Sequence, residues 1–268
     1  MDAKTIVQIL WYANTAAILI LLIRLVYARL APVYRWFWWY LLAVFLEQVV
    51  RIVLQSRPRA SAYAYSTSHS VEVLMSVFLV TELYRLGLAS HPAIARYGRR
   101  AAGYLLGAAG VIAGAGLLLL PILGPVRPGR SPAMYYFYAF ERTMDSAVLL
   151  FLLLAVAFML WFPLRISQNV AVFIGGFVTY FVSRWAFLLT LGMRPALVND
   201  LNAAAMSLSL LCFVGWIALL RPEGESVSTV TGHRWNPEEM ERLSRQLTAI
   251  NARLERFSEK SEYISLQS

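Results

Sequence analysis

The sequence predicts an all-α, polytopic membrane protein with seven transmembrane helices and a C-terminal cytoplasmic amphipathic helix. Of its 268 residues, 59% are hydrophobic and only 15% are charged, whereas soluble domains average about 25% charged residues. Long apolar runs recur along the chain, and a bilayer core needs about 20 apolar residues per helix. The chain ends in a charged stretch, residues 236–268, in which apolar residues recur at helical spacing.

The net charge of +9 does not indicate nucleic acid binding. Most arginines lie at the ends of apolar runs, where they would contact lipid headgroups. Cys212 is the single cysteine, so an intrachain disulfide is excluded. The first apolar run lacks a basic n-region and a small-residue cleavage site, so we expect a spanning helix and not a cleaved signal peptide. The lipid bilayer is therefore the expected partner.

The seven predicted spans form one domain, residues 1–221. They are Thr5–Tyr27, Trp36–Gln55, Ser70–Leu88, Ala101–Leu123, Met134–Phe162, Asn169–Leu191 and Leu201–Leu220. We expect a polar loop at residues 56–68 and a short turn at 163–168. The fourth span carries two Gly-x-x-x-Gly pairs, which allow close helix packing within the bundle or across a dimer seam.

The distribution of arginine predicts the orientation. The loops after the first, third, fifth and seventh spans carry more arginines than the loops on the other side. The positive-inside rule places the arginine-rich loops in the cytoplasm. We therefore expect a protein of the bacterial inner (plasma) membrane with its N-terminus outside and its C-terminus in the cytoplasm.

The tail divides into a polar linker, residues 222–235, and a helix, residues 236–268. Asn236 is a good N-cap, Pro237 suits the first helical position, and Glu238 and Glu239 complement the helix dipole. Apolar residues follow at alternating spacings of three and four, which is the seam of a coiled coil. The seam consists of Met240, Leu243, Leu247, Ile250, Leu254 and Phe257. It predicts a homodimer contact, with a helix lying on the inner membrane face as the alternative.

Ionisable residues inside the predicted spans mark a candidate site, because charges in hydrocarbon are costly and usually face protein or water. The topology places eight of them in one layer toward the outside. The candidate ligand- or ion-binding residues are Glu47, Arg51, Glu72, Glu141, Arg142, Asp145, Arg184 and Asp200. Glu82 is the exception, because it lies near the inner end of the third span.

Spacing predicts how these residues pair. Glu47 and Arg51 are four apart and Arg142 and Asp145 are three apart, so each pair shares a helix face. Arg184 is the expected cross-helix partner of Glu141 or Asp145. Acids outnumber arginines in the layer, so we expect protonated carboxyls, a bound cation or water. The alternative is a salt-bridge network that only fixes helix register.

Other sites are not expected. The seventh span has no lysine, so a retinal Schiff base is excluded. His69, His91 and His233 are scattered, without a metal-binding spacing, and we expect none of them in the middle of a helix. No Walker loop or catalytic triad is present. The sequence therefore predicts no cofactor and no metal, and it gives no specific support for an enzyme.

Four short motifs resemble those of an uncharacterised bacterial seven-helix integral membrane protein family. They are Leu10-Trp11-Tyr12, Thr81-Glu82-Leu83-Tyr84-Arg85, Phe140-Glu141-Arg142 and Leu220-Arg221-Pro222-Glu223. The resemblance implies that seven helices form one unit and implies no activity.

The function expected from the residues is receptor-like or sensory, with an outer polar site that binds a small ligand or ion and a cytoplasmic helical output. A transporter or channel for small solutes, ions or protons is the alternative, and a scaffolding protein is the second alternative.

Overall fold

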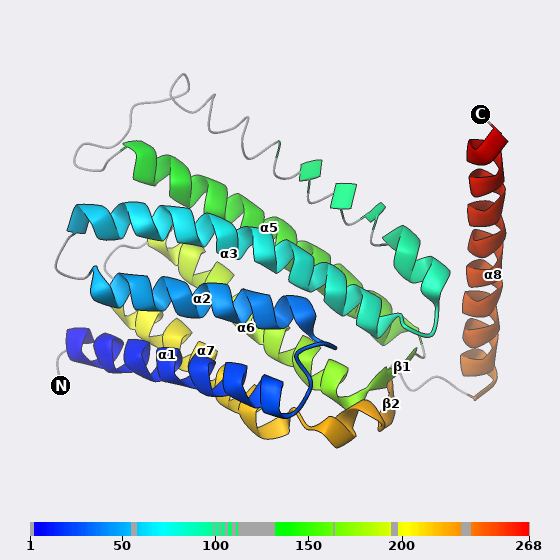
Figure 1. The fold of residues 1–268 in the computed structure, drawn as a ribbon, viewed down its shortest axis with the longest axis horizontal. Coiled ribbons are helices and arrows are strands. Elements are labelled where there is room, and N and C mark those ends of the chain that lie inside the picture. Colours follow the sequence, from blue (N-terminus) through cyan, green and yellow to red (C-terminus); the bar gives the residue numbers. More distant parts are fainter. Residues whose placement is uncertain are drawn as a thin grey trace.

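The chain forms a bundle of long helices in the computed structural model (Figure 1). The structure describes residues 3–54, 58–98, 100–101, 103–104, 107–108, 111, 132–162, 164–193, 198–231 and 237–267. The long helices are α1 (Ala3–Tyr27), α2 (Arg35–Val53), α3 (Pro58–Gly87), α5 (Pro132–Trp161), α6 (Gln168–Met193), α7 (Val198–Leu219) and α8 (Pro237–Gln267). The shorter elements are β1 (Leu164–Ser167), β2 (Ser228–Thr231) and the 3-10 helix η2 (Pro222–Glu225).

Six of these helices form a closed ring. Helix α1 packs against α2 and α7, α2 against α3, α3 against α5, α5 against α6, and α6 against α7. Helix α6 also contacts α3 across the ring. Helix α8 lies across one end of the bundle (Figure 1). We call this the α8 end, and we call the opposite end, where α1 begins, the cluster end.

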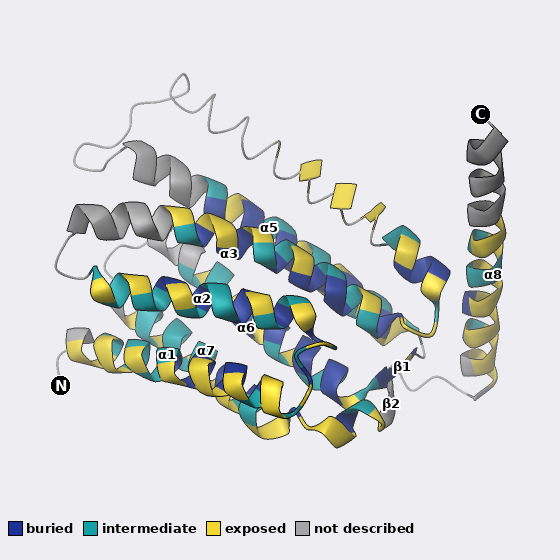
Figure 2. Cartoon of the chain, viewed as in Figure 1, coloured by how far each residue is buried: buried dark blue, intermediate teal, exposed yellow. Residues whose placement is uncertain are grey.

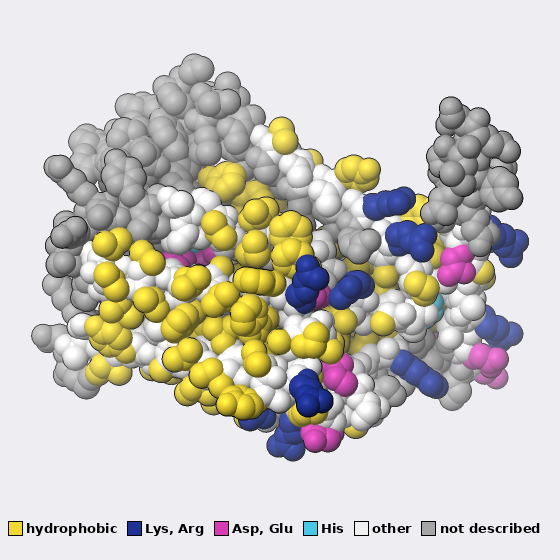
Figure 3. All heavy atoms as spheres, in the orientation of Figure 1, with side chains coloured by type: hydrophobic (Ala, Val, Ile, Leu, Met, Phe, Trp, Pro, Cys, Tyr) yellow, Lys and Arg dark blue, Asp and Glu magenta, His cyan; other side chains and the backbone are white. Residues whose placement is uncertain are grey.

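The ring has the surface of a membrane protein. Five helical stretches are long and apolar enough to cross a bilayer: Thr5–Tyr27, Arg35–Val53, Phe140–Trp161, Gln168–Phe187 and Asp200–Leu219. Large apolar side chains such as Ile20, Leu46 and Leu74 point outward. A broad apolar surface covers the face in Figure 3, and basic side chains gather toward the α8 end. An apolar surface of this extent fits contact with membrane lipid.

Inward-facing residues recur every three or four positions on each helix, as expected for a helix with one buried face. Figure 2 shows these buried stripes facing the bundle interior. On α6 the stripe runs Asn169, Phe173, Phe177, Tyr180 and Arg184. It is therefore polar at both ends and aromatic in the middle.

The middle of the bundle is an aromatic layer. Phe37 of α2 packs edge-on against Phe173 of α6, with ring centroids 4.3 Å apart. Phe177 lies 4.7 Å from Trp216 of α7. All four side chains are at most 2% exposed. This aromatic layer separates the polar groups at the cluster end from those at the α8 end.

Helix α3 begins earlier than the sequence indicated. The expected polar loop at 56–68 is helical from Pro58 onward, so His69 lies within a helix and not at its edge. Proline suits the first turn of a helix, and the alanines that follow favour helix despite the intervening serines. The low hydropathy of residues 58–68 led to their assignment to a loop.

The turn after α5 and the expected linker after α7 pair with each other. Strand β1 runs antiparallel to β2, with Leu164 opposite Thr231 and Ser167 opposite Ser228. Leu164 and Ile166 are buried beneath the bundle end. Strands of four residues are too short to produce a clear periodic signal, which explains why the sequence did not reveal them.

Helix α8 is attached to the bundle by one face. Leu247 is 2% exposed and joins the bundle core, with Leu254 packed beside it. The Asn251 side chain accepts hydrogen bonds from the backbone N–H groups of Ala93 and Ile94, at 3.0 and 3.3 Å. Ile250, on the predicted dimer seam, is 47% exposed. Part of the seam is therefore used within the chain.

The fourth predicted span, Ala101–Leu123, falls mostly outside the described residues. Gly103 and Gly107 are described, and a Cβ atom built on either meets no described atom within 4 Å. No described helix therefore packs closely against this glycine pair. Gly110 and Gly114 lie outside the described residues, as do the side chains of Met240 and Phe257.

Candidate functional site

Six ionisable side chains from four helices meet inside the cluster end of the ring. We call them the ionic cluster: Glu47 of α2, His69 and Glu72 of α3, Glu141 and Asp145 of α5, and Arg184 of α6. The histidine and the four acids are each at most 4% exposed. The Arg184 side chain is 15% exposed. Charges so well removed from water persist only where other charges or hydrogen bonds compensate them.

Arg184 of α6 contacts carboxylates on two other helices of the ring, α3 and α5. Its Nε donates to Asp145 Oδ2 at 2.8 Å. One terminal nitrogen donates to Glu72 Oε1, and the other lies 3.4 Å from Glu141 Oε1. A planar guanidinium with five donors suits such a position, because it can serve several carboxylates at once. Arg184 therefore neutralises Asp145 and Glu72 most directly, while its contact with Glu141 is longer.

His69 has a carboxylate oxygen at each ring nitrogen. Nδ1 lies 2.7 Å from Glu72 Oε2 and 3.7 Å from Glu47 Oε2. Nε2 lies 2.8 Å from Glu141 Oε1 and also contacts Arg184. A neutral imidazole carries one N–H and one lone pair. If the single ring proton is on Nδ1, Arg184 meets the lone pair of Nε2. If the proton is on Nε2, the contact between Nδ1 and Glu72 needs a second ring proton, a protonated carboxyl or a metal ion.

Neighbouring groups hold the rim of the cluster. The Tyr40 hydroxyl donates to Glu72 Oε1 at 2.9 Å and lies 3.1 Å from the Tyr180 hydroxyl. Arg51, whose side chain is 40% exposed, lies 3.7 Å from Glu47 Oε1. The Tyr40 phenol thus orients the Glu72 carboxylate, and the Arg51 guanidinium lies beside the Glu47 carboxylate.

Negative charge exceeds positive charge in this cluster. With four ionised carboxyls, Arg184 and an imidazolium leave two negative charges, and Arg51 at the rim offsets one. Glu141 Oε2 and Asp145 Oδ1 are buried without a hydrogen-bond partner among the residues that the structure describes. Buried oxygens of this kind are costly unless a proton, water or cation meets them.

The structure brings most of the predicted site residues together. Glu47, Glu72, Glu141, Asp145 and Arg184 converge, and the Glu47–Arg51 pair lies at the edge. Arg142 and Asp200 are exposed and do not join the cluster. Arg142 is adjacent to the buried Glu141, so the helix turns it away by about 100°. Asp200 lies in the first turn of α7, where a carboxylate suits the helix dipole.

His69 was not among the site residues predicted from the sequence. Its exclusion rested on the expected loop at 56–68, and that expectation was wrong. The signal was present, because His69 and Glu72 are three apart and share a helix face once α3 is extended. The expectation that no histidine lies within a helix is corrected by this residue.

A second polar group, at the α8 end, involves neutral donors. Tyr34 donates its hydroxyl proton to Glu225 Oε1 at 2.5 Å, and the Asn169 amide donates to the same oxygen at 2.8 Å. The Asn169 amide also donates to the Arg221 carbonyl at 2.7 Å. Burial, followed by the hydrogen bond to Glu225, raises the pKa of Tyr34 well above its usual range. Tyr34 therefore remains a donor at any physiological pH.

Glu82 occupies a structural position. Its carboxylate accepts hydrogen bonds from the backbone N–H groups of Trp36 at 2.9 Å and Phe37 at 3.4 Å, in the first turn of α2. Arg85 lies 3.6 Å away. A carboxylate that meets the free N–H groups of a helix start satisfies them and complements the dipole. This role accounts for the position of Glu82 away from the predicted outer layer.

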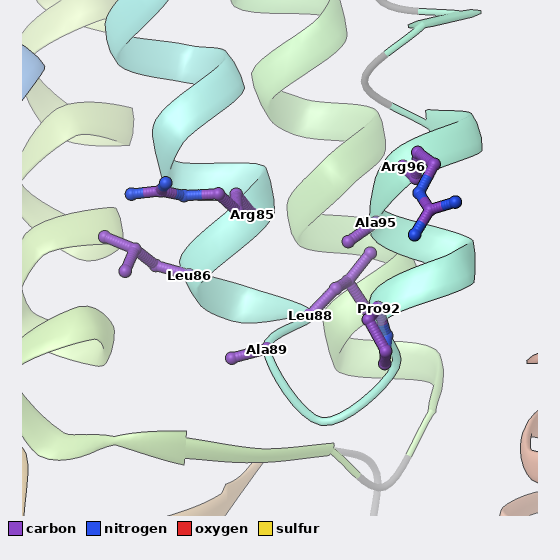
Figure 4. Close-up of a pocket in the computed structure, with 7 residues that line it drawn as sticks. All are labelled: Arg85, Leu86, Leu88, Ala89, Pro92, Ala95 and Arg96. Carbon is purple, nitrogen blue, oxygen red and sulfur yellow. The ribbon is translucent and has the colours of Figure 1, made fainter.

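A pocket of about 390 Å³ lies at the α8 end, between the end of α3 and residues 92–98 (Figure 4). Arg85 and Arg96 approach it from these two segments. Its lining consists of Arg85, Leu86, Leu88, Ala89, Pro92, Ala95 and Arg96. None of the eight predicted site residues lines this pocket, which adjoins the α8 attachment instead.

No protein-family model, no curated protein and no solved structure matches the chain. The resemblance to bacterial seven-helix membrane proteins stays a prediction.

Proposed function

We propose that this protein is a receptor-like membrane sensor, in which a small cation in the ionic cluster controls the docking of α8. The observation that carries the proposal is the position of His69 between carboxylate oxygens at both ring nitrogens. With the ring proton on Nε2, that arrangement is stable only with added positive charge at Nδ1. The charge state of the cluster and its helix packing are therefore linked.

Helix α3 provides the connection to the output. It carries His69 and Glu72 at the cluster end, and Glu82 holds the start of α2 near the α8 end. The chain then continues to Ala93 and Ile94, whose N–H groups bind Asn251 of α8. A shift of α3 on cation binding would change this contact. The coupling is a shift in population between two helix arrangements.

The proposed topology keeps seven spans, with the cluster toward the outside and α8 in the cytoplasm of a bacterial cell. A transporter is the other candidate, favoured by the surplus of buried carboxyls. The aromatic layer of Phe37, Phe173, Phe177 and Trp216 argues for sensing, because it places bulky apolar rings between the cluster and the α8 end. Transport needs a polar path through that layer.

The proposal is tested by distance measurements in the full chain. Spin labels are attached at Ala89→Cys and Arg253→Cys, both exposed positions, in a Cys212→Ala background. The protein in lipid nanodiscs is then treated with NaCl, MgCl2, MnCl2 or ZnCl2 at constant pH, and separately acidified. We expect at least one treatment to change the distance distribution, and Glu141→Gln to suppress the change.

Arg142→Gln is the matched control, because it alters the exposed neighbour of Glu141. It is expected to respond as the parent protein does. Identical distance distributions under every treatment would show that α8 does not report on the cluster. Cation flux into liposomes without any change in α8 would favour the transporter.

A further inference from the structure

The ionic cluster contains a set of atoms arranged as metal ligands. Glu47, His69 and Glu72 each offer one ligand atom, and the three atoms all lie within 4.8 Å of one another. His69 Nδ1 is 2.7 Å from Glu72 Oε2 and 3.7 Å from Glu47 Oε2. Ligands of a tetrahedral zinc ion are about 3.3 Å apart, given bonds of about 2.0–2.1 Å. Small side-chain movements suffice to reach that spacing.

The second atom of each ligand group is already held. His69 Nε2 lies 2.8 Å from Glu141 Oε1 and also contacts Arg184. A proton on Nε2 that is donated to Glu141 would leave the Nδ1 lone pair directed at the carboxylates of Glu47 and Glu72. Glu72 Oε1 accepts from Tyr40 and Arg184, and Glu47 Oε1 lies 3.7 Å from Arg51. Metal-binding histidines and carboxylates are oriented by outer partners of this type. The ionic cluster therefore contains both the ligand atoms of a metal site and the outer partners that would orient them.

Charge balance favours a divalent ion over a proton. With a neutral imidazole, the four carboxylates carry four negative charges. Arg184, Arg51 and a divalent cation together supply four positive charges. A single proton leaves the buried groups with one uncompensated negative charge, which is costly in a low-dielectric interior.

We propose that Glu47, His69 and Glu72 bind one divalent transition-metal ion, Zn²⁺ or Mn²⁺, with Glu141 orienting the His69 ring. One imidazole and two carboxylates suit these ions better than Mg²⁺ or Ca²⁺, which prefer oxygen ligands alone. Three protein ligands leave a coordination position for water. This assignment rests on the proposed function of the cluster as a cation site and names the ion it takes.

Metal content provides the test. The full chain, purified in detergent and stripped with a chelator, is loaded with Zn²⁺ or Mn²⁺ and analysed by elemental mass spectrometry. About one ion per chain is expected. His69→Gln and Glu72→Gln should abolish stoichiometric binding. Glu141→Gln should weaken binding by about 10- to 100-fold, the usual effect of losing an outer partner.

Two controls separate the site from surface binding. His91→Gln removes a histidine outside the cluster, and Asp200→Asn removes an exposed carboxylate, so both should bind as wild type does. X-ray absorption of the Zn²⁺-loaded wild type should show only nitrogen and oxygen ligands at about 2.0–2.2 Å, including imidazole. This measurement needs no variant, so it remains decisive if a cluster variant fails to fold.

Absence of stoichiometric metal in the wild type would overturn the assignment, as would sulfur from Cys212 in the spectrum. Equal binding by wild type and a folded His69→Gln variant would also overturn it. Failure of the sensor proposal has a different signature, namely stoichiometric metal with no movement of α8. Movement of α8 on acidification alone, without metal binding, would sustain the sensor proposal and reject the metal.

Discussion

The two polar groups of the bundle differ in how their carboxylates are satisfied. At the α8 end, the hydrogen bonds to Glu225 and Glu82 come from neutral donors, namely a phenol, an amide and backbone N–H groups. Arg85 adds one longer ionic contact to Glu82, at 3.6 Å. At the cluster end, four carboxyls crowd around one guanidinium and one imidazole, and two of their oxygens have no described hydrogen-bond partner. The first arrangement is complete without any ligand. The second has surplus negative charge and two oxygens that a proton, water or cation could meet, so the comparison separates a structural site from a candidate binding site.

The ionic cluster should show the largest response to mutation. Arg184→Gln removes the donor to Asp145 and Glu72 and leaves buried charge uncompensated, which costs about 3–5 kcal/mol in comparable pairs. We expect a large fall in thermal stability in detergent. Arg142→Gln, one α5 turn away from Asp145 and exposed, should change stability by less than about 0.5 kcal/mol. Equal stability of both variants would contradict the bridging role of Arg184.

The docking face of α8 should respond next. Leu247→Ala deletes a side chain that is 2% exposed, and truncations of this kind cost about 2–5 kcal/mol. We expect α8 to detach, measured as faster limited proteolysis between residues 232 and 267 with the bundle intact. Ile250→Ala, on the same predicted seam but 47% exposed, should leave proteolysis unchanged.

The same pair of variants tests the predicted dimer. If the seam served a homodimer instead of docking, Ile250→Ala would weaken association measured by light scattering in detergent. Loss of dimerisation in both variants, with unchanged proteolysis, would contradict intramolecular docking.

A glycine at the α8 end should show a moderate effect. Gly224 is buried, and a Cβ atom there would overlap the Asn169 side chain. Gly224→Ala should therefore displace Asn169 from Glu225 at a cost of about 1–3 kcal/mol. Thermal unfolding of the variant and the wild type measures this loss of stability. Metal binding by the ionic cluster should stay at the wild-type level, because the aromatic layer lies between the two regions.

The smallest effect is expected from Tyr34→Phe, at about 1 kcal/mol for one lost hydrogen bond. Because the folded protein raises the pKa of Tyr34 above its ordinary value of 10.0, its contribution is fully present below pH 10.0. It is lost as pH rises further, when the unfolded chain releases the proton more readily. Unfolding measured across alkaline pH should show a shallower decline in Tyr34→Phe than in wild type.

Much of the bundle followed from hydropathy, because five of the seven predicted spans coincide with described helices that are long and apolar enough to cross a bilayer. The pairing of Arg184 with acids of α5 was also predictable, since buried charges on neighbouring helices need partners. The rotation of each helix about its own axis was not predictable, so the exposed Arg142 was grouped with the buried Glu141. His69 was missed because α3 begins in a serine-rich segment that hydropathy assigns to a loop. The β1–β2 pairing involves strands too short for periodicity to identify.

The most direct test of the link between the two ends is hydrogen exchange of the Ala93 and Ile94 amides, which donate to Asn251. Their exchange is measured with and without Zn²⁺ or Mn²⁺, in wild type and in His69→Gln. We predict that metal changes exchange in wild type by roughly 5- to 150-fold, the usual range of coupling between sites, and leaves His69→Gln unchanged. Identical exchange with and without metal in a wild-type protein shown to bind it would contradict the account.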